Sequence, residues 1–340
     1  MSIQPVVAVG VDPHVDTIAV AGVDGLGAVV WESTAPNTPG GIAGLVGSAG
    51  SEVWAVEGSG ALGRLLADSL IGRGVSVFEV PTRLTARLRL RAGFSKSDRA
   101  DAAAIARMAL AETLPPVDHD PIIEALRVLV GQRESLVKGQ VEASNRIRAR
   151  LRELDSEAAR RLPRLRGRAM FEAILERLPE ADPDPHRQAL IVATGLQAQE
   201  CIDRIGRIRR LEAEIRKVMP PGGSKLMEIP GIGLITAAMI LAATGNIDRF
   251  PTEGHYARYA GTAPLDASSG RQQRHRLNRW GNRSLNQAIH IAVVTQLQRG
   301  GQSHHYITRR IAEGKTKQEA IRAAKRYLTR HIYRTLKQHP

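Results

Sequence analysis

The sequence predicts an α/β domain followed by two mainly helical regions. Strand-like and helix-like segments alternate over the first 115 residues, long charged helices follow, and basic residues concentrate in the last part of the chain. We therefore expect three domains, residues 1–115, 116–219 and 220–340, a number that the length of 340 residues allows.

The first expected domain opens with three strands and then alternates helix and strand. β-branched apolar runs predict strands, and apolar residues at helical spacing between glycines predict helices. The expected strands are Val6–Val11, Thr17–Val23, Ala28–Ser33, Val53–Glu57 and Val75–Val80. The expected helices are Gly41–Gly47, Ala61–Gly72 and one that carries Asp98 and Asp101 and ends near Ala111, before Pro115 and Pro116. Three antiparallel strands, a β-α-β unit and a closing helix are the order of a ribonuclease H-like fold.

Four acidic residues in this domain fall where one metal site would need them. Asp12 and Glu57 each end an apolar strand run, and the carboxyl ends of such strands border the crevice that holds ligands. Asp98 and Asp101 are three residues apart at the start of a helix, so they share a face. Carboxylate oxygens are the ligands that Mg²⁺ prefers, and several carboxylates repel one another without a cation. The four residues therefore predict a Mg²⁺ site suited to phosphodiester chemistry.

Each acid also has an ordinary structural interpretation. Asp12 and Glu57 are followed by proline and glycine, so both fit turn positions. Asp98 and Asp101 lie in the first turns of a helix, where the helix dipole favours negative charge. The metal hypothesis rests on the four residues taken together.

From about Pro121 the pattern changes to long, charged helices. Apolar residues recur at threes, fours and sevens along the first helix, as in an imperfect coiled coil: Ile122, Leu126, Leu129, Leu136, Ala143, Ile147 and Leu154. A proline-rich break separates it from a second helix with an apolar side formed by Ile202, Ile205, Ile208, Ile215 and Val218. Two interpretations stay open: a dimerisation arm whose arginines contact nucleic acid, or a helical spacer with a solvated face.

The third region is expected to begin at a linker, Pro220-Pro-Gly-Gly223. The segment Ile229–Leu241 that follows has a helix–hairpin–helix signature. Gly231 and Gly233 would let backbone N–H groups approach a phosphate in front of a helix N-terminus. Because glycines also make ordinary tight turns, the nucleic-acid interpretation depends on the basic residues nearby.

The whole net charge of +14 can be placed between Arg271 and Pro340. This stretch holds 16 Lys or Arg and two acidic residues, whereas bases and acids balance in the rest of the chain. Such a surface implies a polyanionic partner and salt-dependent binding. The alternatives are a merely soluble basic surface and an anionic membrane; without a long apolar span we expect no membrane partner. Aromatic residues that would stack on nucleotides lie among the bases: Trp280, Tyr306, Tyr327 and Tyr333.

A loop between Gly261 and Ser284 combines serines with arginines. Ser268 and Ser269 precede a glycine, and four arginines follow closely: Arg271, Arg274, Arg276 and Arg279. Guanidinium groups stabilise the charge that develops on phosphoryl oxygens, so a serine in this setting is a candidate nucleophile for a phosphodiester. No base lies beside the serines in the sequence, so activation would come from the metal site or an arginine. The alternative is a loop whose arginines only bind phosphate.

Cysteine usage and the first residues favour a cytoplasmic protein, which we also expect to be associated with the nucleoid. A single cysteine, Cys201, excludes an intrachain disulfide framework and fits a reducing compartment. No basic-then-apolar leader precedes the first strand, so secretion is not expected. The ten histidines lack cysteine partners and the spacing of a structural zinc site.

The ordered set of motifs resembles the DEDD transposases of the insertion-sequence one-ten family, which are related to the Piv invertases. The resemblance covers nearly the whole chain. Its N-terminal motifs are Gly10-Val-Asp12-Pro-His14, Val56-Glu57-Gly-Ser-Gly60 and Lys96-Ser-Asp98-Arg-Ala-Asp101-Ala102. Its C-terminal motifs are Pro230-Gly-Ile-Gly233, Tyr259-Ala-Gly-Thr-Ala-Pro264, Ser269-Gly270 and Trp280-Gly-Asn282. Each motif is unspecific alone, but the ordered set is specific.

This resemblance implies a RuvC-like N-terminal domain, a coiled-coil arm and a C-terminal transposase domain. It implies a site-specific DNA recombinase guided by a structured non-coding RNA, the bridge RNA, that pairs with donor and target DNA. The acidic tetrad Asp12, Glu57, Asp98 and Asp101 would bind Mg²⁺, and Ser269 would become covalently linked to DNA, with Ser268 beside it as the alternative assignment. Assembly as homodimers and homotetramers is also implied.

Two departures from the family pattern and one competing function accompany this expectation. Val15 follows His14 where the family often has lysine, and Arg271-Gln-Gln stands where many relatives have glycine and lysine. The competing enzyme is a Mg²⁺-dependent junction-resolving nuclease that cuts with metal-activated water. A non-catalytic architectural protein whose acids are structural is the third hypothesis.

Overall fold

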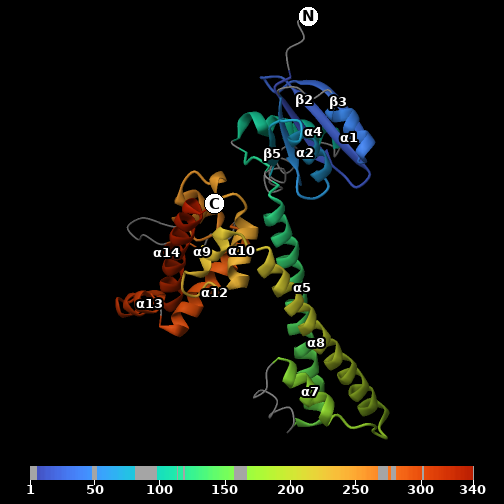
Figure 1. Ribbon diagram of the computed structural model, residues 1–340, viewed down its shortest axis with the longest axis vertical. Helices are drawn as coiled ribbons and strands as arrows, with labels where there is room; N and C mark the ends of the chain where they lie inside the picture. Colours follow the sequence, from blue (N-terminus) through green and yellow to red (C-terminus); the bar gives the residue numbers. More distant parts are fainter. Residues whose placement is uncertain are drawn as a thin grey trace, which may run out of the picture. The chain divides into compact units, whose positions relative to one another are not determined.

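The computed structural model describes residues 6–47, 52–80, 98–112, 114–117, 119–156, 167–266, 275–276, 281–300 and 302–339. The chain divides into two compact units, Met1–His119 and Asp120–Pro340 (Figure 1). Each unit has its own core and is described separately.

The first unit is built on a five-stranded mixed sheet in the order β3-β2-β1-β4-β5. Its strands are β1 (Ala8–Pro13), β2 (Thr17–Val23), β3 (Val29–Pro36), β4 (Val53–Glu57) and β5 (Val77–Val80). β1 lies at the centre, antiparallel to β2 and parallel to β4. The five predicted strands and three predicted helices of this unit are confirmed, with ends that differ by a few residues.

Strand alternation gives the sheet two unlike faces. Large side chains fill the face under helices α1 (Pro39–Val46) and α2 (Arg64–Ile71): Val9, Val11, Ile18, Val20, Trp54, Val56 and Val77. Small side chains dominate the face under helix α4 (Asp98–Ala111): Ala8, Ala19, Ala21 and Ala55, which pack with Ala102, Ala103, Ile105 and Ala106 of the helix. The α4 helix can therefore lie very close to the sheet.

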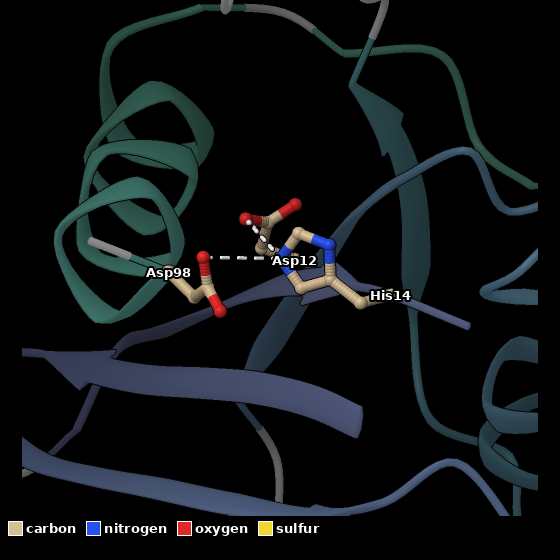
Figure 2. Close-up of side chains that lie close together, drawn as sticks. All are labelled: Asp12, His14 and Asp98. Carbon is tan, nitrogen blue, oxygen red and sulfur yellow. Dashed lines mark ion pairs between the residues drawn. The ribbon is translucent and has the colours of Figure 1, made fainter. Parts of the chain in front are cut away.

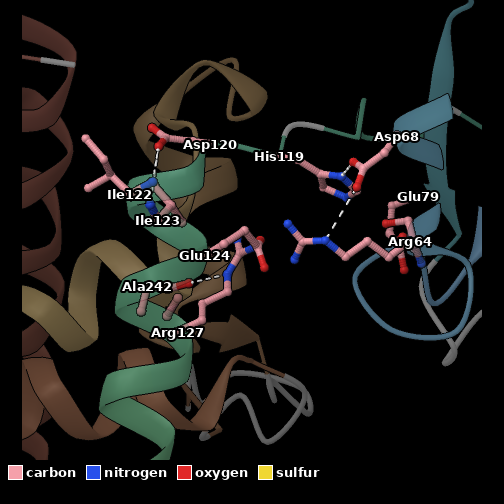
Figure 3. A network of polar contacts seen from close by, with 12 residues as sticks. Arg64, Asp68, Glu79, His119, Asp120, Ile122, Ile123, Glu124, Arg127 and Ala242 are labelled. Carbon is pink, nitrogen blue, oxygen red and sulfur yellow. Dashed lines mark hydrogen bonds and ion pairs between the residues drawn. The ribbon is translucent and has the colours of Figure 1, made fainter. Parts of the chain in front are cut away.

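The second unit begins with two long helices that pack along each other, α5 (Pro121–Leu154) and α8 (Pro185–Lys217). Asp120 caps α5 by accepting hydrogen bonds from the amides of Ile122 and Ile123 (Figure 3). The predicted apolar stripe needs one correction, because Ile122 is 43% exposed and the neighbouring Ile123 is buried instead. The short helix α7 (Arg168–Arg177) completes a small core with α5 and α8 that includes Cys201.

The remaining helices pack with the first part of α5 around one core. They are α9 (Pro221–Met227), α10 (Leu234–Thr244), the short 3₁₀ helix η2 (Ile247–Arg249), α11 (Glu253–Tyr259), α12 (Arg283–Arg299), α13 (Gln302–Ala312) and α14 (Lys317–Gln338). Two short strands of two residues each, β6 (Leu265–Asp266) and β7 (His275–Arg276), pair antiparallel between α11 and α12. Among the described helices, none combines the length and apolarity that crossing a bilayer requires.

The predicted linker at Pro220-Pro-Gly-Gly223 is wrong, because this segment forms the start of α9. Pro221 stands at the first position of the helix, where its missing N–H costs nothing. Gly222 and Gly223 are buried, and a Cβ on Gly223 would lie 2.1 Å from Met219 Sδ. Close packing, rather than flexibility, accounts for the two glycines.

Candidate active site

The alternation of the strands directs two predicted acids toward α4. Asp12 follows Ala8 and Gly10 at intervals of two along β1, and Glu57 follows Ala55 in the same way along β4. Residues two apart on a strand point to the same face. Asp12 and Glu57 therefore belong to the small-residue face, on which α4 carries the other two acids.

Gly10 allows α4 to approach close enough to complete this arrangement. A Cβ on Gly10 would lie 2.0 Å from the carbonyl oxygen of Ala102 and 2.3 Å from the backbone nitrogen of Ala106. Real Cβ atoms do not tolerate such contacts with backbone, so any larger residue would force α4 away from β1. Because Asp98 begins this helix, the contact at Gly10 sets its distance from Asp12.

Asp12 and Asp98 meet at the imidazole of His14 (Figure 2). His14 Nε2 lies 3.3 Å from Asp12 Oδ2 and 3.3 Å from Asp98 Oδ1. The Asp12 side chain is 8% exposed, whereas those of His14 and Asp98 are 45% and 57% exposed. The site is therefore buried on the sheet side and open to solvent on the other.

These three residues form a compact set of potential metal ligands. One ligand atom from each lies within 4.8 Å of the others, and no other such set occurs in the part of the chain that the structure describes. His14 belongs to the first family motif, but the sequence indicated no role for it. Its spacing was the available signal, since a residue two beyond Asp12 in an extended chain returns to the same side.

The other two predicted acids lie near by but outside this set. Glu57 is half-buried at the end of β4, and Asp101 is half-buried in the first turn of α4. Neither contributes an atom to the compact set of Asp12, His14 and Asp98. The structure thus unites two of the four predicted acids, and the complete tetrad remains a prediction.

The two carboxylates of this set fit a hard divalent cation, whereas the imidazole of His14 is a softer ligand. Two carboxylates from different elements converge, and their mutual repulsion falls when a positive ion lies between them. Carboxylate oxygens on an open, solvent-accessible site suit Mg²⁺, which keeps several water ligands. Asp12 and Asp98 would hold such an ion. It would supply charge neutralisation at a phosphodiester.

Asn37 fixes the loops that border the site, a role that the sequence did not indicate. Its Nδ2 donates to the carbonyl oxygen of His14 at 2.8 Å and to that of Leu62 at 3.1 Å. These carbonyls follow β1 and β4, the two strands that carry Asp12 and Glu57. One amide therefore joins both loops at the carboxyl edge of the sheet.

The predicted residues of the serine loop are only partly described. Ser268, Ser269, Arg271, Arg274 and Arg279 lie outside the described residues, and the structure describes only the backbone of Arg276, in β7.

The ends of this loop are held together tightly. A Cβ on Gly281 would lie 2.3 Å from Gly261 Cα. Asn286 Nδ2 donates to the carbonyl oxygens of Ala260 and Gly261, at 2.7 and 3.2 Å. Lys325 Nζ donates to Asn286 Oδ1, and burial lowers the pKa of this lysine. These contacts therefore hold Gly261 and Gly281, the described residues on either side of the loop, next to each other.

The two glycines predicted to contact phosphate have different surroundings. Gly231 has φ +84°, and its Cβ position lies 2.6 Å from the carbonyl oxygen of Ala292 in α12. Packing alone therefore accounts for Gly231. Gly233 precedes α10 without a side-chain cap, and nothing lies within 4 Å of its Cβ position. A phosphate contact stays a prediction, and Gly233 has the more suitable surroundings.

The predicted basic surface includes an arginine row on α14. Arg326, Arg330 and Arg334 recur every four residues, at 3.7, 2.8 and 3.4 Å from the carboxylate oxygens of Glu253. One carboxylate faces three guanidinium groups, so the row keeps a positive surplus. Tyr327 beside it is 57% exposed, and the guanidinium of Arg330 lies 5.9 Å from its ring centroid.

Comparison with known proteins identifies the family. Residues 223–308 match the transposase IS116/IS110/IS902 family, and residues 9–155 match the transposases with DEDD acidic motifs of the IS110 group.

An uncharacterized 43.6 kDa protein of insertion element IS110 from Streptomyces coelicolor is 32% identical over 274 residues, which cover 67% of each chain. An uncharacterized 44.8 kDa protein of insertion element IS116 from Streptomyces clavuligerus is 27% identical over 312 residues, covering 79% of this chain and 78% of the relative. The pilin gene-inverting protein of Moraxella bovis is 32% identical over 118 residues, covering 34% of this chain and 37% of the relative. The chain described here therefore belongs to the IS110/IS116/IS902 family of insertion-sequence transposases.

Proposed function

We propose that this protein is a Mg²⁺-dependent DNA recombinase that moves an insertion sequence by transesterification. Its first unit would act as a RuvC-like domain in which Asp12, Glu57, Asp98 and Asp101 hold the metal. Transposases cleave and rejoin DNA, so the family supports the reaction class. The compact set of Asp12, His14 and Asp98, whose ligand atoms lie within 4.8 Å of one another, is the observation that carries the metal hypothesis.

Ser269 is the proposed nucleophile. Its Oγ would attack a DNA phosphodiester, forming a serine–phosphate bond while the bond to the leaving strand breaks and that strand departs as a hydroxyl. A hydroxyl of the new partner strand would then displace the serine. Because the phosphodiester energy is conserved in the intermediate, rejoining needs no ATP. The close contact between Gly261 and Gly281 brings together the described residues on either side of the segment that carries Ser269.

The remaining partners follow from the charge and the family resemblance. We propose that a structured guide RNA selects donor and target DNA by base pairing. The arginines of the serine loop would bind these nucleic acids: Arg271, Arg274, Arg276 and Arg279. Backbone N–H groups at Gly231 and Gly233 would contribute further phosphate contacts, with Gly233 the better placed of the two. Residues 1–115 would carry the metal chemistry, residues 116–219 the helices for assembly into dimers and tetramers, and residues 220–340 the serine. The protein would be found with the nucleoid.

A suicide DNA substrate with its guide RNA tests the proposal. Mg²⁺ should allow wild-type protein to form a covalent adduct, and mass spectrometry after proteolysis should place the nucleotide on Ser269. Ser268→Ala serves as the matched control and should form the adduct, whereas Ser269→Ala should bind both nucleic acids without forming it. A nucleotide on Ser268, Ser284, Tyr256 or Tyr259 would refute the serine assignment. Cleavage without any adduct would instead indicate a junction-resolving nuclease.

A further inference from the structure

Glu79 on β5 binds the turn that follows Glu57 through both of its carboxylate oxygens. Oε1 accepts a hydrogen bond from the amide of Gly58 at 3.2 Å, and Oε2 accepts one from the amide of Ser59 at 3.0 Å. Glu79 is half-buried near the end of its strand (Figure 3). Two adjacent N–H groups that point at one anion are a strong, charge-assisted arrangement.

The strand register separates Glu79 from the acids of the candidate site. Glu79 pairs with Val56, and Val80 pairs with Glu57. Since paired residues point to the same face, Glu79 lies on the large-residue face with Val56, and Glu57 lies on the α4 face. Glu79 therefore reaches the turn from the opposite side of the sheet, where it is not placed to share a metal ion with Asp12 and Asp98.

The turn leaves little freedom for the residues around it. Gly58 has φ +70°, a left-handed conformation that glycine adopts readily. Its carbonyl oxygen accepts hydrogen bonds from the amides of Ala61 and Gly63, at 2.9 and 3.2 Å. A Cβ on Gly63 would lie 2.6 Å from Val56 Cγ1, so the chain after the turn packs directly on β4.

The hydrogen bond to Gly58 acts directly on the backbone of Glu57. The N–H of Gly58 and the carbonyl of Glu57 belong to one planar peptide group. Holding this N–H therefore restrains ψ of Glu57 and so holds the main chain of Glu57, from which its side chain projects, at the junction of strand and turn. Groups that hold a metal ligand in this way commonly change metal affinity by about 10–100-fold when they are removed.

We propose that Glu79 is a positioning residue for the metal centre, acting through the Gly58–Ser59 turn on Glu57. This inference rests on the proposed function, because it requires Glu57 to be a metal ligand. The substitution Glu79→Gln removes the charge and leaves one acceptor oxygen for two amides. Glu32→Gln is the matched control, because Glu32 lies exposed on β3 of the same sheet.

Hydrogen exchange in the full-length protein without metal measures the first step. Exchange at the amides of Gly58 and Ser59 should become about tenfold faster in Glu79→Gln and stay unchanged in Glu32→Gln. Mn²⁺ binding, measured by electron paramagnetic resonance, gives the second step. Glu79→Gln should weaken Mn²⁺ binding about tenfold, and Glu32→Gln should not weaken it.

A double-mutant cycle with Glu57→Gln tests whether the effect passes through Glu57. The effect of Glu79→Gln on Mn²⁺ affinity should disappear when Glu57 is already glutamine. Unchanged exchange, unchanged Mn²⁺ affinity or additive effects would each overturn the inference. Asp12→Asn separates this outcome from failure of the proposed function. If Asp12→Asn abolishes Mn²⁺ binding while the effects of Glu79→Gln and Glu57→Gln on Mn²⁺ affinity are additive, only the role of Glu79 is rejected. If Asp12→Asn binds Mn²⁺ normally, the metal centre itself is rejected.

Discussion

The two faces of the central sheet bury side chains of different size and serve different purposes. Under α1 and α2, large residues such as Val9 and Trp54 fill the space and bury apolar area, which stabilises the unit. Under α4, Gly10 and a group of alanines bury less area per residue. In return, the backbone of α4 comes close to β1, and Asp98 comes close to Asp12. The comparison shows that small residues can position a site where large ones would only stabilise a fold.

The substitution Gly10→Ala should disturb the small-residue face, and the site on it, more than any other change. The new Cβ meets backbone atoms at 2.0 and 2.3 Å, so α4 must move and carry Asp98 with it. We expect a stability loss of about 1–3 kcal/mol and a loss of DNA cleavage of about 100-fold, because displacement by about 1 Å has this effect on catalytic groups.

The neighbouring substitution Val9→Ala is the control for Gly10→Ala. Val9 is 1% exposed on the other face, and its truncation should cost about 2 kcal/mol. Cleavage measured well below both unfolding midpoints should be reduced by Gly10→Ala and not by Val9→Ala. Equal losses of activity would mean that stability alone explains the effect of Gly10.

Truncation on the large-residue face should lower stability without changing metal affinity. Leu66 in α2 is fully buried, so Leu66→Ala should reduce the free energy of unfolding by about 2–5 kcal/mol. Urea titration measures this loss, and Mn²⁺ titration of the folded variant should give wild-type affinity. Weaker Mn²⁺ binding would show that the two faces do not act separately.

Asn37→Asp tests the amide that joins the two loops at the edge of the sheet. Aspartate has the same shape but cannot donate to the carbonyl oxygens of His14 and Leu62. We expect a loss of about 1–3 kcal/mol in unfolding free energy, because two carbonyls lose their donor and face a carboxylate. Chemical denaturation checks this value, and an unchanged midpoint would show that solvent replaces the amide.

Gly44→Ala should have the smallest effect and the opposite sign. Gly44 is exposed in α1, and nothing lies within 4 Å of its Cβ position. Alanine restricts the unfolded chain and favours the helix, so stability should rise by about 0.4–1 kcal/mol. The melting temperature should therefore fall in Gly10→Ala and rise in Gly44→Ala. A melting temperature lowered in both variants would contradict the role given to the close contact at Gly10.

Local patterns in the sequence predict much of this first unit. Apolar runs located β1, β2 and β4, and placed Asp12 and Glu57 at strand ends. Contacts between distant segments could not be read in this way. Gly10 is required only because α4 packs on it, and Glu79 is significant only because β5 lies beside β4. The composition of Pro220–Gly223 favoured a linker, but helix packing in the second unit decided otherwise.

Crystals of the full-length protein grown with Mn²⁺ would show directly whether the close approach of α4 lets Asp12 and Asp98 hold one divalent ion. Anomalous scattering locates Mn²⁺ independently of activity. We expect a peak about 2.0–2.6 Å from a carboxylate oxygen of each residue, and no peak at this position in Asp12→Asn. A bound ion at another position, or none at Mn²⁺ concentrations that support DNA cleavage, would contradict this expectation.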